Sequence, residues 1–336
     1  MDNLTHTLTG LFLSRAGLNR WTPGASAILM LAANAPDIDV VTAAGGSLNY
    51  LHYHRHLTHS LAAMPVMAIL PVLLVRGVSR KPVHWLGAFC AALIAVASHL
   101  LLDWTNSYGI RMLLPFSGEW LRLDWTNVID IWIWAALLLA LAGPLLARLV
   151  GSEITSGALR QRYPGRGFAI FALCFLMLYN FGRGTLHARA VGELESRIYG
   201  DSAPLRVAAL PNAANPLEWR GLAETRETYA IAGLNLAQPF DPTRAQIFHK
   251  PDSEPASDPA IAAATRSATF QQFLRFSQFP FWRISPADEP ENSKLVEVMD
   301  MRFGSPIAPG FMASAVVDSR LRVLRTAFQF GVIRPR

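Results

Sequence analysis

The sequence predicts a mostly α-helical integral membrane domain, with about four transmembrane helices and a short N-terminal helical hairpin, followed by a small α+β soluble domain. Hydrophobic residues make up 51% of the 336-residue chain and charged residues 16%, whereas soluble domains usually carry about 25% charged residues. The long apolar runs lie before residue 185, and short segments separated by Pro, Asn and Gly follow it. We therefore expect a membrane-embedded domain over residues 1–182 and an extracytoplasmic α+β domain over residues 183–336.

Four apolar stretches are candidates for membrane-spanning helices. A helix needs about 20 residues to cross the hydrocarbon layer, with roughly 17 as the lower limit. The second and third stretches reach this length, and the first and fourth need flanking residues. Two shorter apolar segments, residues 4–13 and 25–35, are predicted to pair as a hairpin among the longer helices. The candidate spans are residues 60–75, 83–102, 128–150 and 167–181.

Basic residues in the short loops predict the orientation of the spans. Cytoplasmic loops carry an excess of Lys and Arg, and placing all the basic loops in the cytoplasm gives a consistent topology. The same residues account for the formal net charge of +6, and no dense basic run interleaved with aromatics supports nucleic-acid binding. The loop residues are Arg15 and Arg20; Arg76, Arg80 and Lys81; and Arg148, Arg160, Arg162 and Arg166.

The chain after residue 181 alternates short apolar segments with turn-forming residues. We predict a helix leaving the membrane over residues 185–198, a loop over residues 250–259 and a helix over residues 270–276. Strands are predicted at residues 205–210, 217–223, 227–236, 294–303 and 320–330.

The densest chemical signal is the run His52-Tyr53-His54-Arg55-His56-Leu57-Thr58-His59-Ser60, which has four histidines in eight positions. Neutral imidazole is the commonest metal ligand among side chains near neutral pH. The run directly precedes a candidate span, which places it at the membrane boundary. An ordinary polar loop at the interface is the alternative interpretation, and a metal site would not need all four rings.

A second signal pairs His99 with Asp103 at the end of an apolar run. Residues four apart lie on one face of a helix, so nitrogen and oxygen ligands can reach one ion. Ionisable groups in such a place are costly and mark function, although a solvated pair at a helix end is the alternative. Asp37 and Asp39 follow a proline at the end of another apolar segment, where they form either a metal-binding pair or an acidic turn or helix cap.

His6 lies on the first apolar segment, near the same predicted face, and is either a ligand or a satisfied polar residue. Gly10, one turn later, permits close helix approach. Asp130 is a weaker candidate for a late ligand or supporting partner. His187 and His249 are interpreted as structural or solvated, and His84 follows a basic loop on the opposite face. Four tryptophans are interpreted as interface anchors: Trp120, Trp125, Trp132 and Trp134.

The candidate ligands are imidazoles and carboxylates without a thiolate, a set that suits zinc or manganese. Cys90 and Cys174 lie inside apolar stretches and predict no disulfide framework. Closed structural zinc sites usually contain cysteine, so this set predicts a catalytic site.

In this order the motifs resemble the YbcI/YdjM family of inner-membrane-bound metal-dependent hydrolases, over roughly residues 1–180. More distantly, the His-x-x-x-Asp helix is similar to zinc-dependent phospholipase C and the P1-type nucleases, which implies an all-helical site with up to three zinc ions and phosphodiester hydrolysis. One departure is His56, where we expect a small residue, commonly glycine. The matching motifs are His6-Thr7-Leu8-Thr9-Gly10, Pro36-Asp37-Ile38-Asp39, His54-Arg55-x-x-Thr58-His59-Ser60, and Ser98-His99-x-x-x-Asp103 with Tyr108-Gly109 and Leu114-Pro115-Phe116.

We therefore predict a multi-pass hydrolase of the inner (plasma) membrane that cleaves a phosphate ester with metal-activated water on the extracytoplasmic side. The cofactor is a divalent metal, zinc or alternatively manganese, and the location favours an amphiphilic or lipid phosphate substrate. Asp39 and Asp103 are the expected catalytic residues, with Asp39 as ligand or general base. The expected metal ligands are His6, Asp37, Asp39, His54, His59, His99 and Asp103; the roles of His52 and His56 stay open. The alternatives are a metal-binding transporter or sensor, and a regulatory membrane scaffold with a structural metal site.

Overall fold

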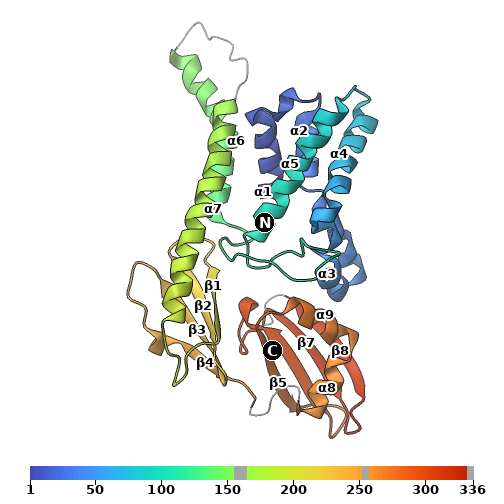
Figure 1. The fold of residues 1–336 in the computed structure, drawn as a ribbon, viewed down its shortest axis with the longest axis vertical. Helices are drawn as coiled ribbons and strands as arrows, with labels where there is room; N and C mark the ends of the chain where they lie inside the picture. The colour runs from blue at the N-terminus through green and yellow to red at the C-terminus, as the bar shows by residue number, and fades with distance from the viewer. Residues whose placement is uncertain (155–164, 252–256, 331–336) are drawn as a thin grey trace. The chain divides into compact units, whose positions relative to one another are not determined.

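The computed structural model describes residues 1–154, 165–251 and 257–330 (Figure 1). The chain forms two compact units. The first, which we call the helical unit, consists of Met1–Asp39, Arg55–His187 and Pro211–Pro216. The second, the sheet unit, consists of Val40–His54, Ala188–Leu210 and the described residues from Leu217 onward. The predicted domain boundary between residues 182 and 183 falls inside a helix, α7 (Arg166–Glu195).

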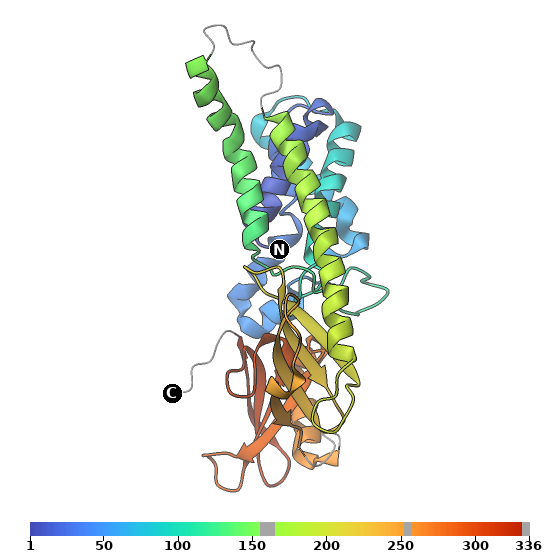
Figure 2. The same cartoon turned by 90° about the vertical axis from the view of Figure 1, so that its left-hand side faces the viewer.

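A tightly packed helix group forms the core of the helical unit (Figure 1 and Figure 2). Helix α5 contacts α1, α2 and α4. One face of α5 carries the fully buried Ala88, Ala91, Ala92 and Ala95, which recur at helical spacing and let the neighbouring backbones approach. The helices are α1 (Asn3–Ala16), α2 (Ala25–Ala32), α4 (Met64–Ser79), α5 (Trp85–Trp104), α6 (Ile131–Ile154) and α7.

Three described helical segments are long and apolar enough to cross a membrane: Leu61–Ser79, Trp85–Trp104 and Arg166–Glu195. A fourth span is formed if α2 and the 3-10 helix η2 (Pro36–Gly45), which meet at a bend of 50°, act as one broken span. The broad layout predicted from the sequence is confirmed. Helix α6 corresponds to the predicted third span; it is apolar over Ile131–Ala147, and its side chains from residue 148 onward lie outside the described residues.

Two further outcomes concern the ends of these helices. The predicted fourth span and the predicted exit helix over residues 185–198 form the single helix α7, because the intervening Gly182 and Gly184 lower helix propensity without ending the helix and no proline separates the two segments. Of the loop arginines used for orientation, Arg160 and Arg162 lie outside the described residues, as does the side chain of Arg148.

Gly10 lies at a close approach of α1 to α2, which agrees with the predicted close helix approach at this residue. A Cβ atom built on Gly10 would lie 2.5 Å from the backbone oxygen of Leu29, so Gly10→Ala forces the two helices apart. We expect this change to destabilise the purified protein by about 1–3 kcal/mol, the usual cost of overpacking, and to lower its thermal unfolding midpoint in detergent. Gly77→Ala in α4 is the matched control, since nothing lies within 4 Å of the added Cβ; equal midpoints for the two variants would contradict the prediction.

The sheet unit contains two four-stranded sheets with strand orders β1-β2-β3-β4 and β5-β6-β7-β8. A shared apolar core contains Leu222 and Tyr229 from the first sheet and Phe281, Met299 and Met312 from the second. The strands are β1 (Arg206–Pro211), β2 (Glu218–Glu224), β3 (Thr228–Asn235), β4 (Gln246–His249), β5 (Pro280–Pro286), β6 (Lys294–Asp300), β7 (Phe311–Val317) and β8 (Val323–Phe330). The helices are α3 (Ser47–Tyr53), α8 (Pro259–Thr265) and α9 (Ala268–Phe276).

The five predicted strands correspond to β1, β2, β3, β6 and β8, whereas β4, β5 and β7 were not predicted. Strand β7 is buried at nearly every position, so it lacks the alternation that identifies a half-buried strand. Strand β5 begins and ends with proline, which weakens its strand signal. The predicted strand 294–303 ends earlier because a 3-10 turn, Met301–Phe303, follows β6.

Candidate metal centre

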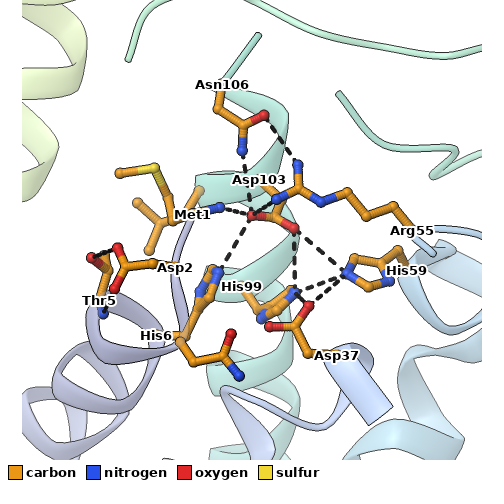
Figure 3. Close-up of polar contacts among 12 residues, drawn as sticks. Met1, Asp2, Thr5, His6, Asp37, Arg55, His59, His99, Asp103 and Asn106 are labelled. Carbon is orange, nitrogen blue, oxygen red and sulfur yellow. Dashed lines mark hydrogen bonds and ion pairs between the residues drawn. The ribbon is translucent and has the colours of Figure 1, made fainter. Parts of the chain in front are cut away.

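Four side chains from three separate segments of the helical unit converge into a group that could hold a metal ion (Figure 3). Asp37 comes from η2, His59 ends the 3-10 helix η3 (Leu57–His59), and His99 and Asp103 lie one turn apart on α5. One ligand atom from each lies within 4.8 Å of the others. The histidines and Asp103 are 0% exposed and Asp37 is 8% exposed.

The spacing of these donor atoms fits a small cation. The two Nε2 atoms of His59 and His99 are 3.1 Å apart. Asp37 Oδ1 lies 3.3 Å and 3.7 Å from them, and Asp103 Oδ2 lies 3.5 Å from each. A tetrahedral zinc ion with bonds of about 2.0–2.2 Å separates its ligands by roughly 3.3–3.6 Å. The group therefore has a size and a donor chemistry that could hold a metal ion.

Hydrogen bonds behind the imidazoles orient both rings toward the centre. His99 Nδ1 lies 2.7 Å from the backbone oxygen of Ala33, so it carries the proton and leaves the Nε2 lone pair facing the group. His59 Nδ1 lies 3.1 Å from Thr58 Oγ1 and 3.2 Å from Asp39 Oδ2. A metal-binding histidine almost always makes such a bond through its other nitrogen.

The carboxylates give the centre a strong preference for positive charge. Burial by itself would lower the pKa of His59, but hydrogen bonds to Asp103, Asp37 and Asp39 outweigh it and raise that pKa to about 10. In the ion-free protein a proton on His59 thus offsets part of the negative charge that a cation would neutralise.

Asp39 is not one of these four donors, but it belongs with Asp37 and His54 to a second group whose ligand atoms lie within 4.8 Å of one another. Its Oδ2 accepts the backbone N–H of Arg55 at 2.8 Å and the hydroxyl of Thr58 at 2.9 Å, and it faces the outer nitrogen of His59. The structure therefore places Asp39 behind a ligand, and its expected roles as ligand or general base stay predictions.

Arg55 is a central residue that the sequence analysis named only as part of the family motif, without a role. Its side chain is 4% exposed. Its Nη2 lies 3.2 Å from Asp103 Oδ1, and its Nη1 donates to Asn106 Oδ1 at 3.0 Å and to the backbone oxygen of Gly109 at 3.2 Å. The Met1 backbone nitrogen also contacts Asp103 Oδ1. The available signal was an arginine inside the histidine run, but sequence alone did not distinguish it from a solvated loop residue.

His6 lies against the group without being one of its four donors. Its ring stacks on His99 with centroids 3.8 Å apart, and its Nε2 is 3.3 Å from Asp103 Oδ1. The ring is fully buried and neither nitrogen makes a hydrogen bond among the described residues. His6 is therefore placed where it can complete or orient the site, and its assignment as a ligand stays a prediction.

His54 and Asp130 lie outside the group of four donors. His54 follows α3, its ring stacks on Tyr50 with centroids 4.4 Å apart, and it is grouped with Asp37 and Asp39 as a possible metal ligand; its ligand assignment stays a prediction. Asp130 precedes α6 and accepts the backbone N–H groups of Trp132 and Ile133 at 3.1 Å and 3.3 Å, so it acts as a helix cap.

Comparisons with known proteins bear on residues that include this centre. The family model of the YdjM inner membrane protein matches residues 1–190. The Bacillus subtilis (strain 168) protein named Uncharacterized protein YfhP is 31% identical over 151 residues, which cover 42% of this chain and 46% of that protein. The match thus spans about half the length of this relative, and no solved structure matches the chain. The apolar helices and the family agree on an inner-membrane location. The chain belongs to the YdjM inner membrane protein family.

Proposed function

We propose that the helical unit is a metal-dependent hydrolase that cleaves a phosphate ester, with zinc as the ion and manganese as the alternative. The observation that carries the proposal is the convergence of Asp37, His59, His99 and Asp103 at spacings that suit a tetrahedral ion. The group has no thiolate, which distinguishes it from common structural zinc sites.

The protein side chains would prepare this centre in three ways. Asp39 and the backbone oxygen of Ala33 fix the ring orientations of His59 and His99. Arg55 holds one oxygen of Asp103 and leaves the other directed at the group. When bound, a divalent ion supplies Lewis-acid polarisation and lowers the pKa of a coordinated water to about 7.

Asp37 marks the side at which a substrate would approach. It is the one donor of the four with measurable exposure, and it has the longest spacing in the group, 3.7 Å to His99 Nε2. Catalytic zinc sites can expand to five ligands, and a fifth ligand would enter on this side. We place the site on the extracytoplasmic side, where it would act on an amphiphilic or lipid phosphate.

The same geometry favours one alternative, a metal-binding sensor or scaffold with a structural ion. Four protein donors complete a tetrahedron, and closed four-ligand sites are typical of structural zinc. In that case the chain would bind the ion without hydrolysing any ester.

Metal analysis combined with a phosphoesterase panel tests the proposal. We expect the full chain, purified in detergent, to carry one or more equivalents of zinc or manganese and to hydrolyse a mono- or diester of p-nitrophenol or a lipid phosphate. Supporting residues around metals are worth about 10–100-fold in activity, so losing a ligand in His99→Ala should cost at least about 100-fold. His249→Ala, on the edge strand β4, should retain full turnover. Bound metal without turnover on any ester would favour the sensor or scaffold, and absence of metal would contradict both.

A further inference from the structure

The Asp39 carboxylate joins the two ends of residues 40–54, which we call the connecting segment, next to the metal centre. Asp39 Oδ2 accepts the backbone N–H of Arg55 at 2.8 Å and the hydroxyl of Thr58 at 2.9 Å. The connecting segment therefore begins and ends at one set of hydrogen bonds. Asp37 lies shortly before these bonds in the chain and His59 directly after them, so two of the four candidate donors flank the connecting segment.

The connecting segment belongs to the sheet unit. Val40–His54 groups with the C-terminal residues and not with the helical unit. Helix α3 packs against α9 and β8. Ser47 Oγ donates to the backbone oxygen of Phe328 at 3.3 Å, and the Tyr50 ring lies 6.0 Å from the ring of Phe330.

Arg55, the residue that follows the connecting segment, has a constrained backbone conformation. Arg55 has φ of +57°, a left-handed conformation that non-glycine residues seldom adopt and that persists where surrounding contacts impose it. Here the contacts are its backbone bond to Asp39 and its guanidinium contacts with Asp103 and Asn106. A change in the path of residues 40–54 therefore acts directly on the residue that holds Asp103.

We propose that residues 40–54 are a positioning element for the metal centre, and that the packing of α3 on β8 and α9 sets the affinity of the centre for its ion. The inference rests on the metal centre of the proposed function but not on hydrolysis. Coupling between two sites is reciprocal, so ion binding also stabilises the packing of α3. The C-terminal residues thereby acquire a role that the family motifs, which end before them, do not give.

The first test weakens the packing of α3 from the sheet side. In Phe330→Ala, the full-length protein loses the ring that lies beside Tyr50, while every residue near the centre is unchanged. We expect zinc affinity, measured by competition with a chelator, to fall by about 5–10-fold, at the lower end of usual coupling factors. Ile307→Ala is the control, because Ile307 is an exposed apolar residue of the same unit. Ser47→Ala weakens the same packing from α3, by removing the hydrogen bond to the backbone oxygen of Phe328, and guards against a local folding defect at residue 330.

The second test measures the reciprocal effect by hydrogen exchange of the full chain with and without zinc. We expect slower exchange in Leu57–His59 and also in Ser47–Tyr53 and Ala268–Phe276. Protection confined to Leu57–His59, or unchanged zinc affinity in both Phe330→Ala and Ser47→Ala, would overturn the inference while leaving the hydrolase proposal intact. Coupling without turnover on any ester would support the inference and contradict the hydrolase proposal. Failure to bind zinc at all would overturn the inference and the hydrolase proposal together.

Discussion

Asp103→Asn is expected to abolish stoichiometric metal binding. Asp103 uses both oxygens: Oδ2 lies 3.5 Å from the Nε2 atoms of His59 and His99, and Oδ1 lies 3.2 Å from Arg55 Nη2. Asparagine keeps the shape of the side chain but loses its charge and one acceptor oxygen. The substitution also leaves the buried guanidinium of Arg55 without its anionic partner, a large penalty in a protein interior.

We expect metal affinity to fall by more than about 100-fold, because even partners outside the ligand sphere are worth about 10–100-fold. The measurement is the metal content of purified protein after dialysis, together with a titration of zinc into the metal-free protein. Asp288→Asn, at an exposed acidic residue of the sheet unit, is the matched control. Full metal content in Asp103→Asn would show that Asp103 is not a ligand.

Arg55→Met is expected to destabilise the metal-free protein strongly and the zinc-bound protein much less. Removing one partner of a buried ion pair costs about 3–5 kcal/mol, because the remaining charge stays uncompensated. In the metal-free protein that charge is Asp103, which keeps its contact with the Met1 nitrogen but loses its guanidinium partner and the order imposed by the Arg55–Asn106 contact. A bound divalent ion neutralises Asp103 independently of Arg55, so zinc should recover much of the lost stability.

The measurement is the thermal unfolding midpoint of each protein with a chelator and with zinc. Zinc should raise the midpoint of Arg55→Met by more than it raises that of the native chain, whereas the exposed Arg226→Met should behave like the native chain. An equal zinc effect in all three proteins would mean that Arg55 and the ion do not share Asp103. Arg55→Lys separates charge from geometry, since lysine keeps the charge but lacks the planar fork that reaches Asp103 and Asn106 together.

The sequence was most informative where local geometry alone brings side chains together. His99 and Asp103 share a helix face through their spacing of four residues, so their proximity followed from the predicted helix. Asp37 and His59 depended on tertiary packing, and the convergence of separate motifs was inferred from a shared membrane face. Their observed spacing of 3.3 Å agrees with that expectation.

The positions of Asp37 and Asp39 relative to the four donors could not be predicted from the sequence. Asp37 and Asp39 are chemically equivalent in the motif, and only the path of η2 decides that one faces the donor group and the other faces the outer nitrogen of His59. Arg55 gave no separate signal, because its burial depends on Asn106 and Gly109, far along the chain. In the sheet unit, β7 was missed since burial of both faces removes the alternating pattern.

The four donors come from three separate segments, and this determines when during synthesis the metal site can form. An ion bound by all four would cross-link residue 37 to residue 103, and such sites do not exist in an unfolded chain. Asp103 is next to the last residue of α5, so the donor set is incomplete until that helix has been synthesised and inserted. Metal loading would then be a late event that follows membrane integration and locks the first hairpin of the chain to α5.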